Sequence, residues 1–169
     1  GTTREIDVEV NDTAKMVARK INAVAASTHV VATAKSYAWL YTPTANPTQG
    51  SVGAVQARLK FMTPAGTAVE TAAFTFTSND VSDAIQKINA VTSSTGVQAS
   101  STGDYKVLLT DNSGNDIKVI NTSARTDLDV NAVGIDGVTP APRQQIETVA
   151  VGTLSTYNGG DGSLTISDG

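Results

Sequence analysis

The stretch that decides the fold is Ile21-Asn22-Ala23-Val24, which returns 67 positions later as Ile88-Asn89-Ala90-Val91. Each copy ends a run of residues with helical spacing. Each is then followed by a strand-like run, Thr28-His29-Val30-Val31-Ala32 after the first and Thr95-Gly96-Val97-Gln98-Ala99 after the second. Because the two copies keep the same order, the rest of the chain is interpreted as strands and turns arranged around two similar units.

Apolar residues recur at helical spacing in both copies, which predicts amphipathic helices over residues 13–26 and 81–94. The apolar stripes consist of Val17, Ile21 and Val24 in the first copy and of Val81, Ile85 and Ile88 in the second. Gly96 follows the second helix, where a left-handed residue commonly ends a helix. His29 stands at the equivalent place, and His is among the non-glycine residues enriched at positive φ. Alternatively, the first helix does not end in the same way as the second.

The repeated residues have a packing explanation. Ile21 and Ile88 fall on the last full turn, facing the sheet, and the alanines that follow allow the helix to approach a strand closely. Asn22 and Asn89 stand at a helix end, where an amide can bond free carbonyl groups or the following turn. We therefore interpret these asparagines as stabilising the turn rather than binding a ligand.

The remaining pattern predicts an α+β fold of two β-α-β-β units with antiparallel sheets, each with one amphipathic helix packed on its sheet. We expect a first unit with a hairpin at residues 1–70, a second unit at 71–125, and returning C-terminal strands at 126–169 that pack on the first unit. Strand 146–151 or 164–167 is expected beside residues 3–10. The predicted strands are 5–10, 30–41, 52–62, 68–77, 97–100, 105–110, 116–121, 146–154 and 164–167, with 128–135 either a helical turn or a strand.

Composition narrows the class of protein. The 169 residues include no cysteine, 40% hydrophobic residues and only 5% aromatic residues, so the core must be aliphatic and disulfide bonds are excluded. The net charge of −4, with both signs interspersed, argues against a nucleic-acid surface, which needs a basic stripe. No apolar run is long enough to span a membrane.

Candidate sites all have a simpler structural interpretation. His29 is the only histidine, so a zinc site is not expected. Residues 111–116 have the oxygen spacing of a loose calcium loop, but a hairpin turn is the better interpretation, and residues 159–164 match only one turn of a calcium-binding β-roll. Asp127 and Asp129 are interpreted as solvated strand edges. Tyr37, Trp39 and Tyr41 share one strand face, which either covers a thin core or offers a carbohydrate platform.

A helix ending in Ile-Asn-Ala, followed by Thr-Gly-Val-x-Ala, resembles the short repeat found in the outer part of bacterial flagellins. The same repeat occurs in the filament cap and in some hook-associated proteins. Residues 79–99 match closely, and residues 12–32 match with His29 in place of the glycine. The two copies cover about 50 of the 169 residues, and the strands between them carry no family motif.

This resemblance implies a structural, surface-exposed outer domain of a flagellar filament protein, outside the cell and without catalytic activity. It implies no cofactor, metal or catalytic residue. Its partners would be other flagellar subunits, through segments missing from this chain, and possible host or other surfaces. Two alternatives remain open: a domain of a filament cap or hook-associated protein, and a carbohydrate- or surface-binding adhesin module that uses Tyr37, Trp39 and Tyr41.

Overall fold

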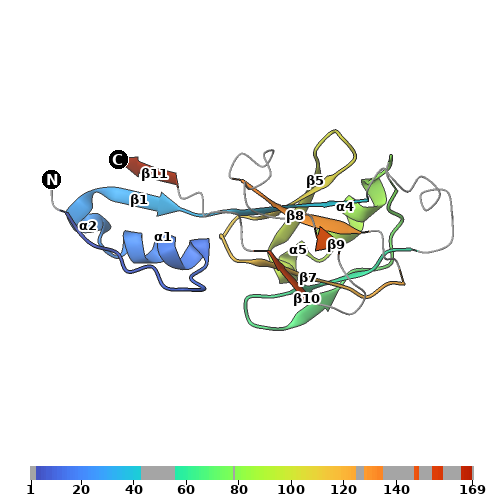
Figure 1. Ribbon diagram of the computed structural model, residues 1–169, viewed down its shortest axis with the longest axis horizontal. Helices are drawn as coiled ribbons and strands as arrows, with labels where there is room; N and C mark the ends of the chain where they lie inside the picture. Colours follow the sequence, from blue (N-terminus) through green and yellow to red (C-terminus); the bar gives the residue numbers. More distant parts are fainter. Residues whose placement is uncertain are drawn as a thin grey trace.

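The computed structural model describes residues 3–42, 56–77, 79–124 and 128–134, together with the backbone of strands at 147–148, 154–157 and 165–168. The molecule is elongated, with a small lobe at one end and a larger lobe at the other (Figure 1). The small lobe contains α1 (Ala14–Asn22), α2 (Ala25–Thr28), β1 (Val30–Thr33) and β11 (Thr165–Asp168). Strand β1 pairs antiparallel with β11, so the first and last described strands lie side by side.

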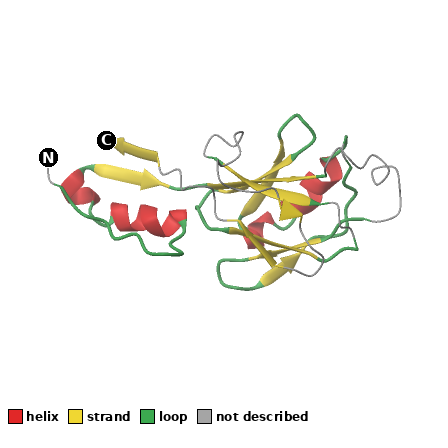
Figure 2. Ribbon diagram, viewed as in Figure 1, coloured by secondary structure: helices red, strands yellow, loops and turns green. Residues whose placement is uncertain are grey.

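The larger lobe contains two antiparallel sheets and two short helices (Figure 2). The five-stranded sheet has the order β5 (Val97–Ser101), β6 (Val107–Asp111), β2 (Ser36–Tyr41), β8 (Asp129–Val133) and β9 (Glu147–Thr148). The four-stranded sheet has the order β10 (Leu154–Tyr157), β7 (Ile117–Asn121), β3 (Leu59–Met62) and β4 (Ala68–Glu70). The helices are α4 (Ser82–Asn89) and α5 (Thr92–Thr95).

One hydrophobic core lies between the two sheets and α4. The strands alternate buried and partly exposed positions in β2, β3, β6 and β7, as expected for sheets with one covered face. The largest enclosed side chains are Phe61, Phe74, Phe76, Leu40, Leu59, Ile88, Leu109, Ile117 and Leu128. The predicted α+β class is therefore confirmed, with an aliphatic core to which three phenylalanines contribute.

Both predicted long helices are divided in two at the same place. The helix stops at Asn22 in one copy and at Asn89 in the other, and a second short helix begins two residues after the alanine that follows. Val24 and Val91, the residues between the paired helices, have φ of −109° and −108°. Equal dihedral angles at equivalent residues show that the sequence repeat is also a repeat of backbone conformation.

The N-terminal prediction of a strand at residues 5–10 is wrong. This segment alternates apolar and acidic side chains but forms no ladder, and Val8 and Val10 are 63% and 92% exposed. Neither returning strand lies beside it, because β9 pairs with β8 and β11 pairs with β1. An alternating pattern selects strand conformation only where a neighbouring strand satisfies the backbone groups.

Two further expectations need correction. The predicted strand 30–41 is two strands, since β1 ends in the small lobe and β2 belongs to the larger lobe. The turn at residues 111–116 is not a hairpin, because β6 and β7 lie in different sheets. The hairpin predicted in the first unit is confirmed by the pairing of β3 with β4. The predicted strands 97–100 and 105–110 correspond to β5 and β6, which pair with each other.

The two lobes meet at the turn after β6. The Lys15 amide at the start of α1 donates a hydrogen bond of 3.0 Å to the Gly114 carbonyl. Gly114 has φ of +71°, and a Cβ placed there would lie 2.5 Å from the Ala34 Cβ. Only glycine fits both the backbone conformation and the space, so this residue fixes the approach of the small lobe.

Candidate functional site

The repeated asparagines act as clamps on edge strands. The Asn22 side chain donates to the Ala32 carbonyl at 2.9 Å and accepts from the Ala32 amide at 2.8 Å. Asn89 makes the same pair of bonds with Ala99, at 2.9 and 2.7 Å. Each amide therefore binds the backbone of the following strand as a neighbouring strand would, rather than the adjacent turn. The prediction that these asparagines stabilise the turn is therefore wrong, because their partners lie on the strand ten residues later.

The threonine and the left-handed residue of the motif also have structural roles. The Thr28 and Thr95 hydroxyls donate to the Val24 and Val91 carbonyls, at 3.1 and 3.0 Å. Each hydroxyl also accepts from the amide two residues later, at 3.3 and 3.2 Å. His29 and Gly96 end the short helices with φ of 58° and 78°, so the predicted positive φ at His29 is confirmed.

The aromatic strand face is partly covered. Tyr37, Trp39 and Tyr41 alternate with buried residues on β2, as predicted. The Lys106 ammonium lies 4.4 Å from the centroid of the Trp39 ring, at a distance typical of a cation–π contact. The Trp39 indole nitrogen is buried and has no hydrogen-bond partner among the described residues. A ring face already contacted by a cation is poorly placed to stack on a sugar.

The acidic residues considered as candidate sites have different environments in the structure. The Asp111 carboxylate accepts the Ser113 amide at 2.7 Å and the Asn115 side chain at 3.1 Å, so its oxygens hold the turn. Asp129 is 6% exposed in the middle of a sheet, so its interpretation as a solvated edge is wrong. Asp127 and residues 159–164 lie outside the described residues. Within the described part of the chain, no three His, Cys, Asp or Glu side chains gather around a possible metal position.

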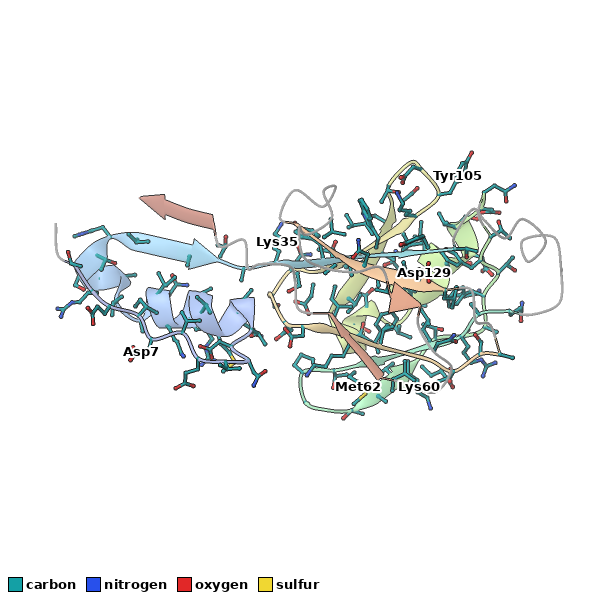
Figure 3. The ribbon with its side chains drawn as sticks, in the orientation of Figure 1. Asp7, Lys35, Lys60, Met62, Tyr105 and Asp129 are labelled. Carbon is teal, nitrogen blue, oxygen red and sulfur yellow. The ribbon has the colours of Figure 1, made fainter. Side chains whose placement is uncertain are left out.

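A cleft of about 460 Å³ lies where the first turns of α1 face the β3–β4 hairpin and the start of β7. Sequence analysis did not identify it, because its walls come from three distant parts of the chain. Among the described residues, the lining includes the cationic Lys15, Arg19 and Lys118 and the two methionines Met16 and Met62, and its only acidic member is Asp116. Figure 3 shows Met62 on the lower part of the larger lobe.

Positive charge dominates this cleft. The ion pairs of the described residues join Lys20 to Asp12, Arg58 to Glu70, Lys87 to Asp83 and Lys106 to Asp104. None of them involves a cation of the cleft. Burial raises the pKa of the Asp116 carboxyl above its ordinary 3.8, and the Lys118 ammonium offsets part of that rise. The cleft therefore presents three cations against one carboxyl group.

No protein-family model and no curated protein matches the chain. Among the described residues, no helix has both the length and the apolar character that a bilayer crossing requires.

The described residues therefore offer two kinds of functional feature. The repeated units hold edge strands with side-chain amides, which is structural work. The cleft between the lobes brings three cationic residues together with two methionines. One sequence signal for the cleft existed, since Lys15 and Arg19 are four residues apart and share a helix face.

Proposed function

We propose that this chain is a surface-exposed outer domain of a bacterial flagellar filament protein, with a structural and non-catalytic role. The observation that carries the proposal is the equivalence of the two Ile-Asn copies. Asn22 and Asn89 bind the strand ten residues later through the same two atoms, at distances that agree within about 0.1 Å. The repeat that resembles the flagellin motif is thus a defined structural unit, used twice.

The shape of the molecule supports the same proposal. The first described residues and β11 lie together at the small-lobe end, and the larger lobe extends away from them (Figure 1). A domain inserted in a longer chain must bring its two ends to one base, and this arrangement satisfies that need. The small lobe would lie nearest the filament axis, and the larger lobe would face the medium.

Protection of strand edges supports an exposed, crowded location. Strands β1 and β5 are edge strands in their sheets, and open edges promote pairing between neighbouring molecules. The asparagine amides occupy the backbone groups of Ala32 and Ala99 on those edges. Closely packed filament subunits would benefit from such protection, because their domains are held at high local concentration.

Immunogold labelling tests the proposal directly. Antibodies raised against the purified chain should decorate isolated filaments of the bacterium that encodes it, and mass spectrometry of sheared filaments should recover its peptides. Antibodies from which chain-specific molecules have been adsorbed serve as the control. Labelling confined to the cell body, with no peptides in the filament fraction, would contradict a filament role.

The position of the label distinguishes the alternatives. Gold along the whole filament supports a flagellin, gold at the distal tip supports a cap protein, and gold at the base of the filament supports a hook-associated protein. For the adhesin alternative, Trp39→Ala should abolish binding to a glycan array. The contact between Lys106 and Trp39 does not favour that outcome.

A further inference from the structure

We propose that the cleft between the lobes binds a small organic anion, a carboxylate or phosphate carried on an apolar body. Its volume of about 460 Å³ lies within the roughly 300–1,000 Å³ typical of small-molecule sites. Lys15, Arg19 and Lys118 supply the charge, and the thioethers of Met16 and Met62 supply the apolar surface. The inference is independent of the filament role, because it rests only on this cleft.

The two repeat copies differ in charge at the start of α1 and α4. In the second copy, Asp83 lies in the first turn of α4 and accepts the Thr75 amide at 2.7 Å, and Asp80 binds Ser82. The equivalent residues of the first copy are Met16 and Thr13, and the first turn of α1 contains no acid. A helix N-terminus favours a negative charge, but the groups that cap α1 are neutral. The Met16 amide donates to the Thr13 hydroxyl at 3.2 Å, and the Lys15 amide donates to the Gly114 carbonyl at 3.0 Å.

Close packing joins the two lobes beside the cleft. The Lys15 amide is bonded to the Gly114 carbonyl, and Gly114 packs against Ala34 without space for a Cβ. The lobes are thus held in contact directly beside the cleft. A cleft that exists before its ligand arrives binds with a smaller loss of conformational entropy than one that must close around the ligand.

The apolar surface determines the kind of anion. Met16 is 44% exposed although it lies beside cationic side chains, and a thioether has no strong hydrogen bond to offer an inorganic ion. An organic body would cover this surface and gain from its removal from water. We therefore expect preference for an organic anion over inorganic phosphate.

The first experiment compares simple probes by two-dimensional NMR of the isotope-labelled chain at pH 7. Benzoate and phenyl phosphate should shift amides of residues 13–19, 62–66 and 115–118, with Kd of about 1 mM or tighter. Benzyl alcohol, which lacks the charge, should leave them unchanged. The tighter of the two anions identifies the preferred charged group. Equal binding of inorganic phosphate, or equal shifts with benzyl alcohol, would overturn the proposal.

The second experiment uses charge variants with a matched control. Arg19→Gln and Lys118→Gln should each weaken binding of the preferred probe about tenfold, since each removes one cation from the site. Asp116→Asn should strengthen it severalfold. Lys87→Gln removes the same charge from α4, outside the cleft, and should leave binding unchanged. Equal affinity in Arg19→Gln, Lys118→Gln and Lys87→Gln would refute a specific site.

Variant spectra separate lost binding from lost folding. Each variant should keep the dispersed amide spectrum of the parent outside the cleft, because all four substituted side chains lie at least partly in solvent. If another variant fails to fold, Asp116→Asn still tests the proposal. This substitution replaces a carboxylate with an amide of nearly the same volume, and the expected result is tighter binding. Weaker binding in a folded Asp116→Asn variant would contradict the charge argument.

Discussion

The conformation of the repeat depends on single residues, and the contribution of Asn89 to stability is the most direct to test. Asn89→Ala removes two hydrogen bonds to Ala99, each worth about 0.5–1.5 kcal/mol, while the freed backbone groups gain some solvation. The free energy of unfolding should fall by about 1–2 kcal/mol in urea denaturation. The Ala99 amide should exchange with solvent faster, whereas Ser100→Ala, at an exposed position of the same strand, should change neither quantity.

A second residue-scale prediction concerns acid. The Asp12 carboxylate accepts the Lys20 ammonium at 2.6 Å and the Glu9 amide at 2.8 Å, and these bonds lower the pKa of Asp12 below 3.8. Because the folded-state pKa is depressed, the stabilisation is present above about pH 4 and is lost as pH falls through the folded-state value. Thermal unfolding of Asp12→Asn should therefore differ from the parent at pH 7 and converge with it at low pH.

The control for this pair is Asp7→Asn. The Asp7 carboxylate belongs to no ion pair among the described residues, although its backbone carbonyl accepts the Lys20 ammonium at 2.9 Å. The variant should follow the parent across the pH range. If Asp7→Asn and Asp12→Asn give the same pH profile, general charge rather than this pair sets the acid response.

At the scale of elements, the two helices are matched but not equally buried. Ile88 is fully enclosed by the main core, whereas Ile21 packs on the two-stranded sheet of the small lobe and stays partly exposed. Ile88→Ala should cost about 2–5 kcal/mol. Ile21→Ala should cost about 1–2 kcal/mol, because less apolar area returns to water. Equal losses in chemical denaturation would show that the two units have the same environment.

The connection between elements is tested at Gly114. In Gly114→Ala the new Cβ meets Ala34 at 2.5 Å and the Lys15 amide at 3.1 Å, so the lobes must separate. The Lys15 amide should lose its protection from hydrogen exchange. Gly66→Ala is a matched control, since Gly66 also has positive φ, +82°, but has no atom within 4 Å of the added Cβ. A similar effect of both variants would assign the cost to backbone strain alone.

Much of the secondary structure could be predicted from the sequence, because it follows from the local pattern of apolar and polar residues. Helical spacing located both helices, and Gly96 and His29 marked their ends. The division of each helix was missed, since Ala and Val give no breaking signal and the break depends on the threonine and asparagine bonds formed later. The distant partner of each asparagine, and the cleft, require contacts between segments that periodicity does not bring together.

At the scale of the whole molecule, the two lobes should differ in local stability. In the small lobe only Ala18 and Ala32 are buried among the described hydrophobic residues, whereas the larger lobe has a continuous core. Regions with few buried contacts open at lower free energy. Hydrogen exchange followed by mass spectrometry should show residues 13–33 exchanging well before residues 97–121. A single cooperative exchange of both segments would contradict this prediction.

Tyr105 also belongs to this scale, because it projects from the β5–β6 loop at the upper edge of the larger lobe in Figure 3. It is 55% exposed and has φ of 62°. In the proposed orientation this loop would be among the parts most accessible to antibodies, so Tyr105→Ala should weaken some antibodies that decorate filaments without affecting assembly.

The pairing of β1 with β11 has a mechanical consequence. Fluid drag on the larger lobe would be transmitted to the base along two neighbouring strands of opposite direction, joined by four residue pairs from Val30–Asp168 to Thr33–Thr165. Tension would be divided between the two strands. For one strand to slip past the other, the hydrogen bonds of the ladder between them would have to break together. In the proposed filament, the narrow end of the molecule would bear a steady pull through this ladder.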